Sequence, residues 1–303
     1  MSRLAFACAL LLLAAPVARA ETSDAERARA LPGRLGLTGF HDMVDARVPK
    51  LLSVRGGLSY RVFVTDQDFR SAFDATRELE THDVDLYAGV SALGPLDAAI
   101  RVPIVYRRDD VDLHGVGEQL QARYDQGFAN LDVAGKVSLD IGPIALAPYA
   151  SGKLPTGDGS LDDLARFDFG VAATFTLFNE YLGIHANIGG LTEEEGLQAF
   201  RYRIGASVVC FASKPLLVRV YGYGDGLEYE GHADTDFDLD FGAQAIIFGI
   251  FQVGAGFTTR LVNGEYIDDD LRDRLDFEGV FDRHFDDDGT WAFELNAGVV
   301  LDF

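Results

Sequence analysis

Charged side chains alternate with apolar ones in several stretches of this chain. Successive side chains of a β-strand point to opposite faces, so each stretch would have one charged face and one apolar face. Rows of guanidinium and carboxylate groups on facing strands can select the ions and polar solutes that pass between them. The bases of the charged faces are Arg55, Arg61, Arg101, Arg107, Lys136, Lys153, Arg201, Arg203, Arg219 and Arg260. An equal number of acids matches them: Asp83, Asp85, Asp97, Asp132, Asp168, Asp236, Asp238, Asp240, Glu294 and Asp302.

A hydrolytic centre is another chemistry that these faces could carry, because His185, Ser207, Asn187 and Asp168 also fall on them. A Ser–His pair that cleaves lipid would have to face the bilayer, where it could reach an acyl ester. The nucleophile-elbow motif is missing. We predict that the protein is not an enzyme, and a lipid-modifying enzyme is the third hypothesis.

Two acidic runs lie in the last long loop: Asp268-Asp269-Asp270 and Asp286-Asp287-Asp288. Clustered carboxylates can bind calcium or bridge magnesium to lipopolysaccharide phosphates, and Asp286, Asp287 and Asp288 would be the candidate ligands. The ligand spacing of an EF-hand is absent. We therefore interpret both runs as a solvated loop, and we predict neither a metal site nor a cofactor.

Twelve segments have the period of two that is typical of a half-buried strand. They are expected near 52–64, 82–92, 96–107, 128–139, 144–154, 167–178, 181–190, 200–211, 216–224, 236–247, 251–262 and 290–303. Short turns alternate with long polar loops, which are expected near 65–81, 108–127, 155–166, 191–199, 225–235 and 263–289. This plan predicts an all-β fold, an antiparallel up-and-down transmembrane barrel with short periplasmic turns and long extracellular loops.

The final segment is apolar or small at every second position from Trp291 to the terminal Phe303. The closing Phe303 resembles the C-terminal signal by which barrel-assembly machinery recognises its clients, so that machinery is an expected partner. Aromatic residues gather at both ends of the expected strands, for example Tyr106 at the loop side and Phe248 at the turn side. Two such girdles are expected where a barrel crosses the two bilayer interfaces.

The chain is strongly acidic, with a formal net charge of −22 over 303 residues. Loss of Arg3 and Arg19 with a leader peptide would make this charge −24. Because the charged strand faces balance, the excess must lie in the long loops, where an acidic vestibule would concentrate cations. A chain without a basic surface is not expected to bind nucleic acid.

The N-terminus predicts export. Arg3 precedes an apolar run at 4–15 and a small-residue cleavage pattern at 17–20, which together are typical of a signal peptide over residues 1–20. Residues 21–50 would then be an N-terminal periplasmic segment, either a free tail or a stretch tucked into the barrel mouth. The barrel would cover residues 51–303 and retain a single thiol, Cys210, which the alternation places on the lipid face.

Pro103 and Pro148 lie inside expected strands, where each removes a donor from the backbone ladder. We expect a bulge or other distortion at each proline. The alternative is a weakened wall through which apolar solutes pass sideways into the membrane.

Two short stretches resemble known families. The sequence Lys153-Leu154-Pro155-Thr156-Gly157-Asp158 follows Ala147-Pro148-Tyr149 and resembles a strand-ending motif of the outer-membrane channel family associated with meta-pathway phenol degradation. Gly36-Leu37-Thr38-Gly39-Phe40 with Asp45-Ala46 resembles the opening of the N-terminal barrel of OmpA-like proteins. The resemblance implies passive transport of small molecules, hydrophobic or aromatic ones among them.

Together these observations predict a porin-like channel in the outer membrane of a Gram-negative cell, in contact with lipid and lipopolysaccharide. Small solutes would pass without a cofactor, and the charged lumen would set the selectivity. The pattern fits a small pore and a mostly filled interior equally well. The alternative hypothesis is a non-conducting surface barrel whose acidic loops bind divalent cations or lipopolysaccharide.

Overall fold

The computed structural model describes residues 26–40, 42–49, 52–70, 74–92, 94–114, 119–157, 166–193, 196–213, 215–229, 235–262 and 285–303. Among these residues, no helix is both long and apolar enough to cross a membrane. The leader expected at 1–20 and the acidic run at 268–270 lie outside the described residues.

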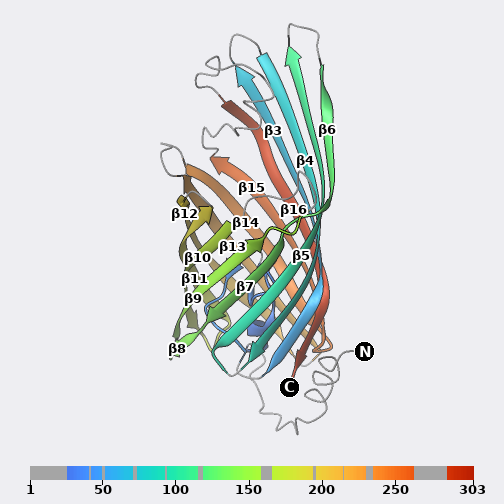
Figure 1. Ribbon diagram of the computed structural model, residues 1–303. Helices are drawn as coiled ribbons and strands as arrows, with labels where there is room; N and C mark the ends of the chain where they lie inside the picture. Colours follow the sequence, from blue (N-terminus) through green and yellow to red (C-terminus); the bar gives the residue numbers. More distant parts are fainter. Residues whose placement is uncertain are drawn as a thin grey trace, which may run out of the picture.

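The strands form one closed antiparallel barrel (Figure 1). Its strands are Ser53–Arg70 (β3), Asp74–Ala92 (β4), Leu96–His114 (β5), Gln119–Phe128 (β6), Leu131–Val137 (β7), Leu139–Ile141 (β8), Ile144–Leu154 (β9), Arg166–Leu177 (β10), Leu182–Glu193 (β11), Gly196–Ala212 (β12), Leu216–Tyr229 (β13), Thr235–Ile247 (β14), Phe251–Val262 (β15) and Phe285–Asp302 (β16). Because β6, β7 and β8 follow one another along one strand of the wall, these fourteen segments make twelve barrel strands. The barrel closes where β16 pairs with β3, and the backbone N–H of Phe303 donates to the carbonyl of Leu52 at 2.8 Å. The predicted twelve-stranded barrel is confirmed.

Alternation along each strand separates apolar from polar side chains, as predicted. Leu58 is 48% exposed on the outer face, whereas its neighbour Ser59 is 1% exposed on the inner face. The exposed outer face is rich in large apolar residues, among them Leu86, Ile100, Val133, Val171, Ile188, Ile204, Phe241, Val253 and Leu295. Cys210 is likewise exposed. A broad apolar outer face is what a lipid-embedded barrel requires.

The wall extends further than the apolar pattern predicted. β3 and β4 occupy most of the loop expected at 65–81, and β5 and β6 occupy most of the one expected at 108–127, so both loop predictions were wrong. The expected loops at 191–199 and 225–235 are shortened in the same way. The backbone ladder continues where both faces are polar, because strand pairing needs hydrogen bonds but no apolar face. Apolar alternation therefore marks only the part of each strand that has an apolar face.

Each of the two prolines lies beside an interruption of a neighbouring strand. β5 pairs with β7 as far as Arg101 and with β6 from Ile104, and the carbonyl of Pro103, between them, accepts the N–H of Ala129 at 3.0 Å. β9 likewise pairs with β8 up to Leu146 and with β7 from Tyr149, on either side of Pro148. Because proline has no N–H to donate, the facing strand can break there without losing a ladder bond.

Residues 26–40 and 42–49, here called the plug, lie inside the barrel at the end that holds the C-terminus and the short turns (Figure 1). The plug contains the 3-10 helix Glu26–Ala30 (η1) and a hairpin of Gly39–Phe40 (β1) with Met43–Val44 (β2). Its apolar side chains are buried, including Leu31, Leu37, Phe40, Met43 and Val44. The described part of the N-terminal segment thus occupies the mouth of the barrel.

Candidate functional site

Phe40 anchors the plug through its aromatic ring, which is fully buried. The ring stacks on Tyr221 with centroids 4.8 Å apart and meets the ring of His185 edge-on at 4.9 Å. The guanidinium of Arg219 lies over the same ring, 5.2 Å from its centroid. Phe40 therefore combines apolar burial with stacking and cation–π attraction, which together favour one position of the plug.

The backbone of the plug has little regular structure of its own, so lumenal side chains replace the missing ladder. The Nζ of Lys136 donates to the carbonyl oxygens of Thr38 at 3.1 Å and Arg47 at 3.2 Å, and also to that of Asp45. A buried carbonyl without a partner is costly, and one ammonium group here satisfies three. Lys136 thus holds both ends of the β1–β2 hairpin in one place.

An asparagine on β11 pairs with the plug as a neighbouring strand would. The Oδ1 of Asn187 accepts the N–H of Val44 at 2.9 Å, and its Nδ2 donates to the Val44 carbonyl at the same distance. On β10, the hydroxyl oxygen of Thr174 accepts the N–H of Ala46 at 3.0 Å. The lumen is therefore shaped to bind this particular backbone.

The turn between β10 and β11 presents a carboxylate to the plug. Phe178, Asn179 and Glu180 have φ angles of 51°, 54° and 74°, a left-handed run that side chains disfavour. Glu180 accepts a hydrogen bond from the Nε of Arg29 at 2.8 Å and one from Nη1 of Arg47 at 3.2 Å. The strained turn thus supports the ion pairs that close the short-turn end.

Acidic residues of β4 and β5 bind the other side of the plug. The Oδ2 of Asp97 accepts the backbone N–H of Thr38 at 2.8 Å. Arg34 donates from Nη2 to Asp83 at 2.7 Å and from Nε to Asp85 at 3.1 Å. The sequence pattern placed these three aspartates on the inward face of the wall, and in the structure they hold the plug.

Asp45 is the buried carboxylate of the plug, with 5% of its surface exposed. Burial by itself would raise its pKa. The neighbouring His185, Lys136 and Arg219, together with a hydrogen bond from the N–H of Arg47, outweigh burial and lower the pKa of Asp45. Asp45 is therefore the anionic centre on which the cationic wall around the plug converges.

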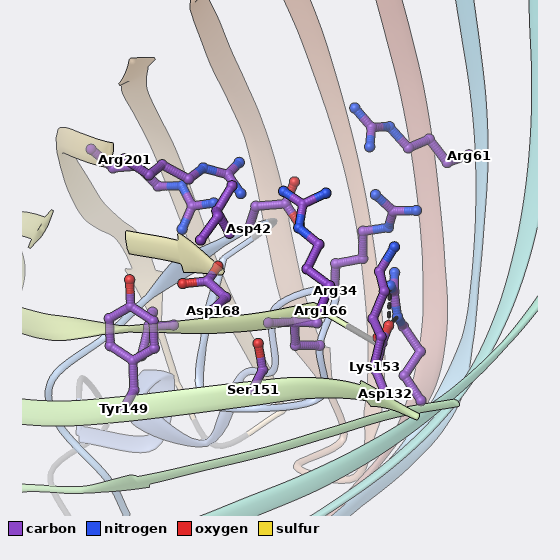
Figure 2. A pocket seen from close by; sticks show the side chains of 15 residues that line it. Arg34, Asp42, Arg61, Asp132, Tyr149, Ser151, Lys153, Arg166, Asp168 and Arg201 are labelled. Carbon is purple, nitrogen blue, oxygen red and sulfur yellow. Dashed lines mark hydrogen bonds and ion pairs between the residues drawn. The ribbon is translucent and has the colours of Figure 1, made fainter. Parts of the chain in front are cut away.

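A cavity of about 270 Å³, here called the chamber, lies between the plug and the lumenal wall (Figure 2). Arg34, Leu35, Asp42 and Val44 line it from the plug. The wall contributes Arg61, Arg101, Asp132, Tyr149, Ser151, Lys153, Arg166, Asp168, Leu191, Arg201 and Arg203, from seven strands between β3 and β12. Arg61 reaches in from β3 on the side of the chamber opposite Tyr149 and Asp168 (Figure 2).

The structure divides the predicted selectivity residues into two groups. Those that line the chamber are Arg61, Arg101, Asp168, Arg201 and Arg203. Those outside its lining are Arg55, Arg107, Arg219, Arg260, Asp83, Asp85, Asp236, Asp238, Asp240 and Glu294. Several of the second group form ion pairs within the wall; Arg260, for example, donates to Asp238 at 2.8 Å, and Arg55 binds Asp97. Much of the predicted charged lumen is therefore internally paired.

Sequence reasoning missed Asp225, which it assigned to a loop. In the structure Asp225 lies on β13 and accepts hydrogen bonds from the Nε of Arg201 at 2.9 Å and the Nε of Arg203 at 3.0 Å. The strand was missed because glycines flank Asp225 and give no apolar alternation. The ring of Phe237 lies where a Cβ at Gly224 would be, and the ring of Tyr202 lies over Gly226. Arg34, Asp42 and Arg166 were also missed, because no strand alternation marked them.

The residues considered for hydrolysis and for metal binding are not assembled into one site. His185 Nε2 lies 2.9 Å from the Ser207 hydroxyl, but both are buried under the plug, and Asp168 lines the chamber instead. Asp286, Asp287 and Asp288 belong to β16, and their side chains lie outside what the structure describes. Within the described ranges, no group of three or more potential ligands could hold a metal ion.

A closed, antiparallel, twelve-stranded wall with an apolar outside and a charged inside defines the class of transmembrane β-barrels of the outer membrane. A solved structure shows the same fold. An outer membrane channel from Pseudomonas putida F1 matches 86% of this chain over 100% of its own length, with 11% identity and a TM-score of 0.56. A Pseudomonas aeruginosa FadL homologue matches 91% of the chain over 95% of its own length, with 8% identity and a TM-score of 0.44. No family model matches the sequence, and no curated protein matches it.

Proposed function

We propose that the protein is a passive outer-membrane channel for small solutes whose periplasmic mouth is closed by the plug. The chamber carries this proposal, because it is a polar cavity of about 270 Å³ inside a closed wall, next to a segment that contributes no strand to the barrel. A solute entering from the long-loop end would meet the chamber and then the plug. Passage would require the plug to shift, while the barrel itself stays intact.

Export and assembly complete the proposal. Residues 1–20 would be removed as a leader, and Phe303 would be recognised by the assembly machinery as the strand that closes the barrel against β3. The apolar outer face supports a bilayer location, with lipid on the strands and lipopolysaccharide near the extracellular loops. The lumen would need no cofactor, since fixed charges alone can discriminate among solutes.

The second candidate is a non-conducting barrel whose loops bind divalent cations or lipopolysaccharide. The close fit of the plug favours it, because the wall satisfies plug backbone groups at Thr38, Val44 and Ala46 within about 3 Å. In that case the plug would be a permanent part of the barrel.

Single-channel recording in planar bilayers separates the two candidates. We expect conductance steps from the full chain, and larger or more frequent steps from a variant whose plug is loosened, such as Lys136→Met. The absence of steps from both proteins over a range of salts would reject the channel and favour the surface barrel.

A further inference from the structure

Four chamber residues form a row across adjacent strands. Arg101 on β5 faces Asp132 on β7, Asp132 faces Lys153 on β9, and Lys153 faces Arg166 on β10. Asp132 accepts a hydrogen bond from the Nε of Arg101 at 2.6 Å. The row thus has three cations and one carboxylate, and like charges directly opposite each other destabilise a sheet. An anion bound beside Arg166 would offset the excess of positive charge in this row.

The other walls of the chamber are also short of carboxylates. Arg201 and Arg203 share the single carboxylate of Asp225. Within the described part of the chain, Arg61 forms no ion pair, and its guanidinium lies 5.7 Å from the centre of the Phe63 ring. On each of these walls the guanidinium groups therefore have more positive charge and more hydrogen-bond donors than the carboxylates of that wall use.

Basic side chains outnumber acidic ones in the lining of the chamber. Seven of its lining residues are basic and three are acidic. Three more carboxylates, those of Asp83, Asp85 and Asp225, lie behind the lining and bind chamber arginines. The lining itself thus has seven cations and three carboxylates, and the further carboxylates lie on the far side of the cations. The surface that a solute meets is positive, although the whole protein is strongly acidic.

The chamber also has an apolar side. Leu35 and Val44 of the plug and Leu191 of β11 contribute to its lining, and Tyr149 and Ser151 carry hydroxyl groups. A ligand that fits this surface needs an anionic group for the guanidinium side and an apolar body for the other. The volume of about 270 Å³ is close to the lower end of small-molecule pockets, roughly 300–1,000 Å³.

We infer that the chamber is a binding site for a small organic carboxylate with an apolar body. This inference rests on the proposed channel function, for which the chamber would be the point where the solute is held before the plug. A guanidinium group binds a carboxylate through two parallel hydrogen bonds, and Lys153 adds a compact charge beside Arg166. The solute would be a carboxylic acid in its ionised form, not a cation drawn in by the acidic loops.

Ligand-observed NMR on the full chain in detergent micelles tests this inference, with hexanoate as the probe and empty micelles as the blank. Its neutral isostere hexanamide and inorganic phosphate are the comparison ligands. We expect saturable binding of hexanoate that weakens with added salt. The double variant Lys153→Gln/Arg166→Gln should weaken that binding about tenfold or more, since two charged partners are lost. Arg61→Gln is an independent second variant, and Arg77→Gln, outside the chamber lining, is the matched control.

Each result decides one part of the inference. Equal binding of hexanamide, or undiminished binding by both the double variant and Arg61→Gln, would overturn the site. Phosphate that binds as tightly as hexanoate would overturn the claim that the ligand has an apolar body. Conductance without hexanoate binding would reject this inference and leave the channel standing. Binding without conductance would reject the channel and leave the site.

Discussion

Replacing Lys136 by Met should release the plug while leaving the barrel closed. Methionine keeps the length of the side chain but removes the ammonium group that reaches the carbonyls of Thr38, Asp45 and Arg47. The Nζ of Lys136 also lies 3.7 Å from the Oδ2 of Asp97. All three carbonyls belong to the plug, and Asp97 of the wall keeps its ion pair with Arg55 when the ammonium group is removed.

The size of the effect follows from these contacts. A hydrogen bond in which one partner is charged contributes about 1.5–3 kcal/mol. The contacts share one donor group, so their individual values do not add. At about 1.4 kcal/mol per tenfold change, the undocked population of the plug should rise on the order of tenfold to a hundredfold.

Two measurements report plug release. Conductance steps should become larger or more frequent in planar bilayers. Val48→Cys, in a background with Cys210→Ser, should react faster with a water-soluble maleimide, because Val48 is 3% exposed while the plug is docked.

The control is Arg77→Met. Arg77 forms a bidentate pair with Asp109 at 2.9 and 3.0 Å and has no described contact with the plug. Unchanged labelling and conductance in Lys136→Met, with the barrel intact by heat-modifiable gel mobility, would refute this account of the plug. Equal effects from Arg77→Met would refute its specificity.

Three further outcomes are expected. Phe40→Ala should weaken plug docking by about 3–5 kcal/mol, the usual cost of truncating a buried Phe, and should raise the labelling rate at Val48→Cys. The pKa of Asp45 is lowered when the plug is docked, so its contribution to docking is complete above the usual pKa of 3.8 and is lost only as the pH falls through the lower pKa of the docked state. Conductance traces from pH 7 to pH 5 should therefore show no plug release caused by Asp45. Replacing Arg101 and Arg203 by Ala should shift the reversal potential in a salt gradient toward cations, and an unchanged potential would show that the chamber does not lie on the path.

The alternation of side chains was enough to predict the lipid-facing part of the wall, because every lipid-facing strand repeats the same two-residue pattern. It identified the inward side of Arg101, Arg203 and Asp85 from the position of each in its strand. It could not show which charges pair, because pairing depends on register across strands and on contacts within the lumen. Arg34 and Asp85 are separated by 51 residues, and their contact exists only because the plug enters the barrel.

The sequence predicted the plug only as one of two alternatives for residues 21–50, a free tail or a stretch tucked into the barrel mouth. Its segment has neither the period of a strand nor that of a helix, because its partners are lumenal side chains and not a ladder. Lys136 lies 98 residues from Thr38, and nothing local in either sequence marks the contact. Asp225 was missed for a related reason, since the glycines beside it make room for Phe237 and Tyr202 and so erase the apolar face of the strand.

Plug position and lumenal charge are linked through Arg34. This residue lines the chamber and also neutralises Asp83 and Asp85 on β4. When the plug leaves, its guanidinium leaves with it, and the two carboxylates behind it face the lumen with fewer cations. Arg101 is then the remaining described partner of Asp85, at 3.2 Å. Asp42 leaves with Arg34, so the net charge of the remaining lining does not change, but the solute loses one of the guanidinium groups that it faced. A solute held by the chamber would lose Arg34 and the apolar surface of Leu35 and Val44 as soon as the plug shifts, and this loss is the condition under which a bound solute can leave.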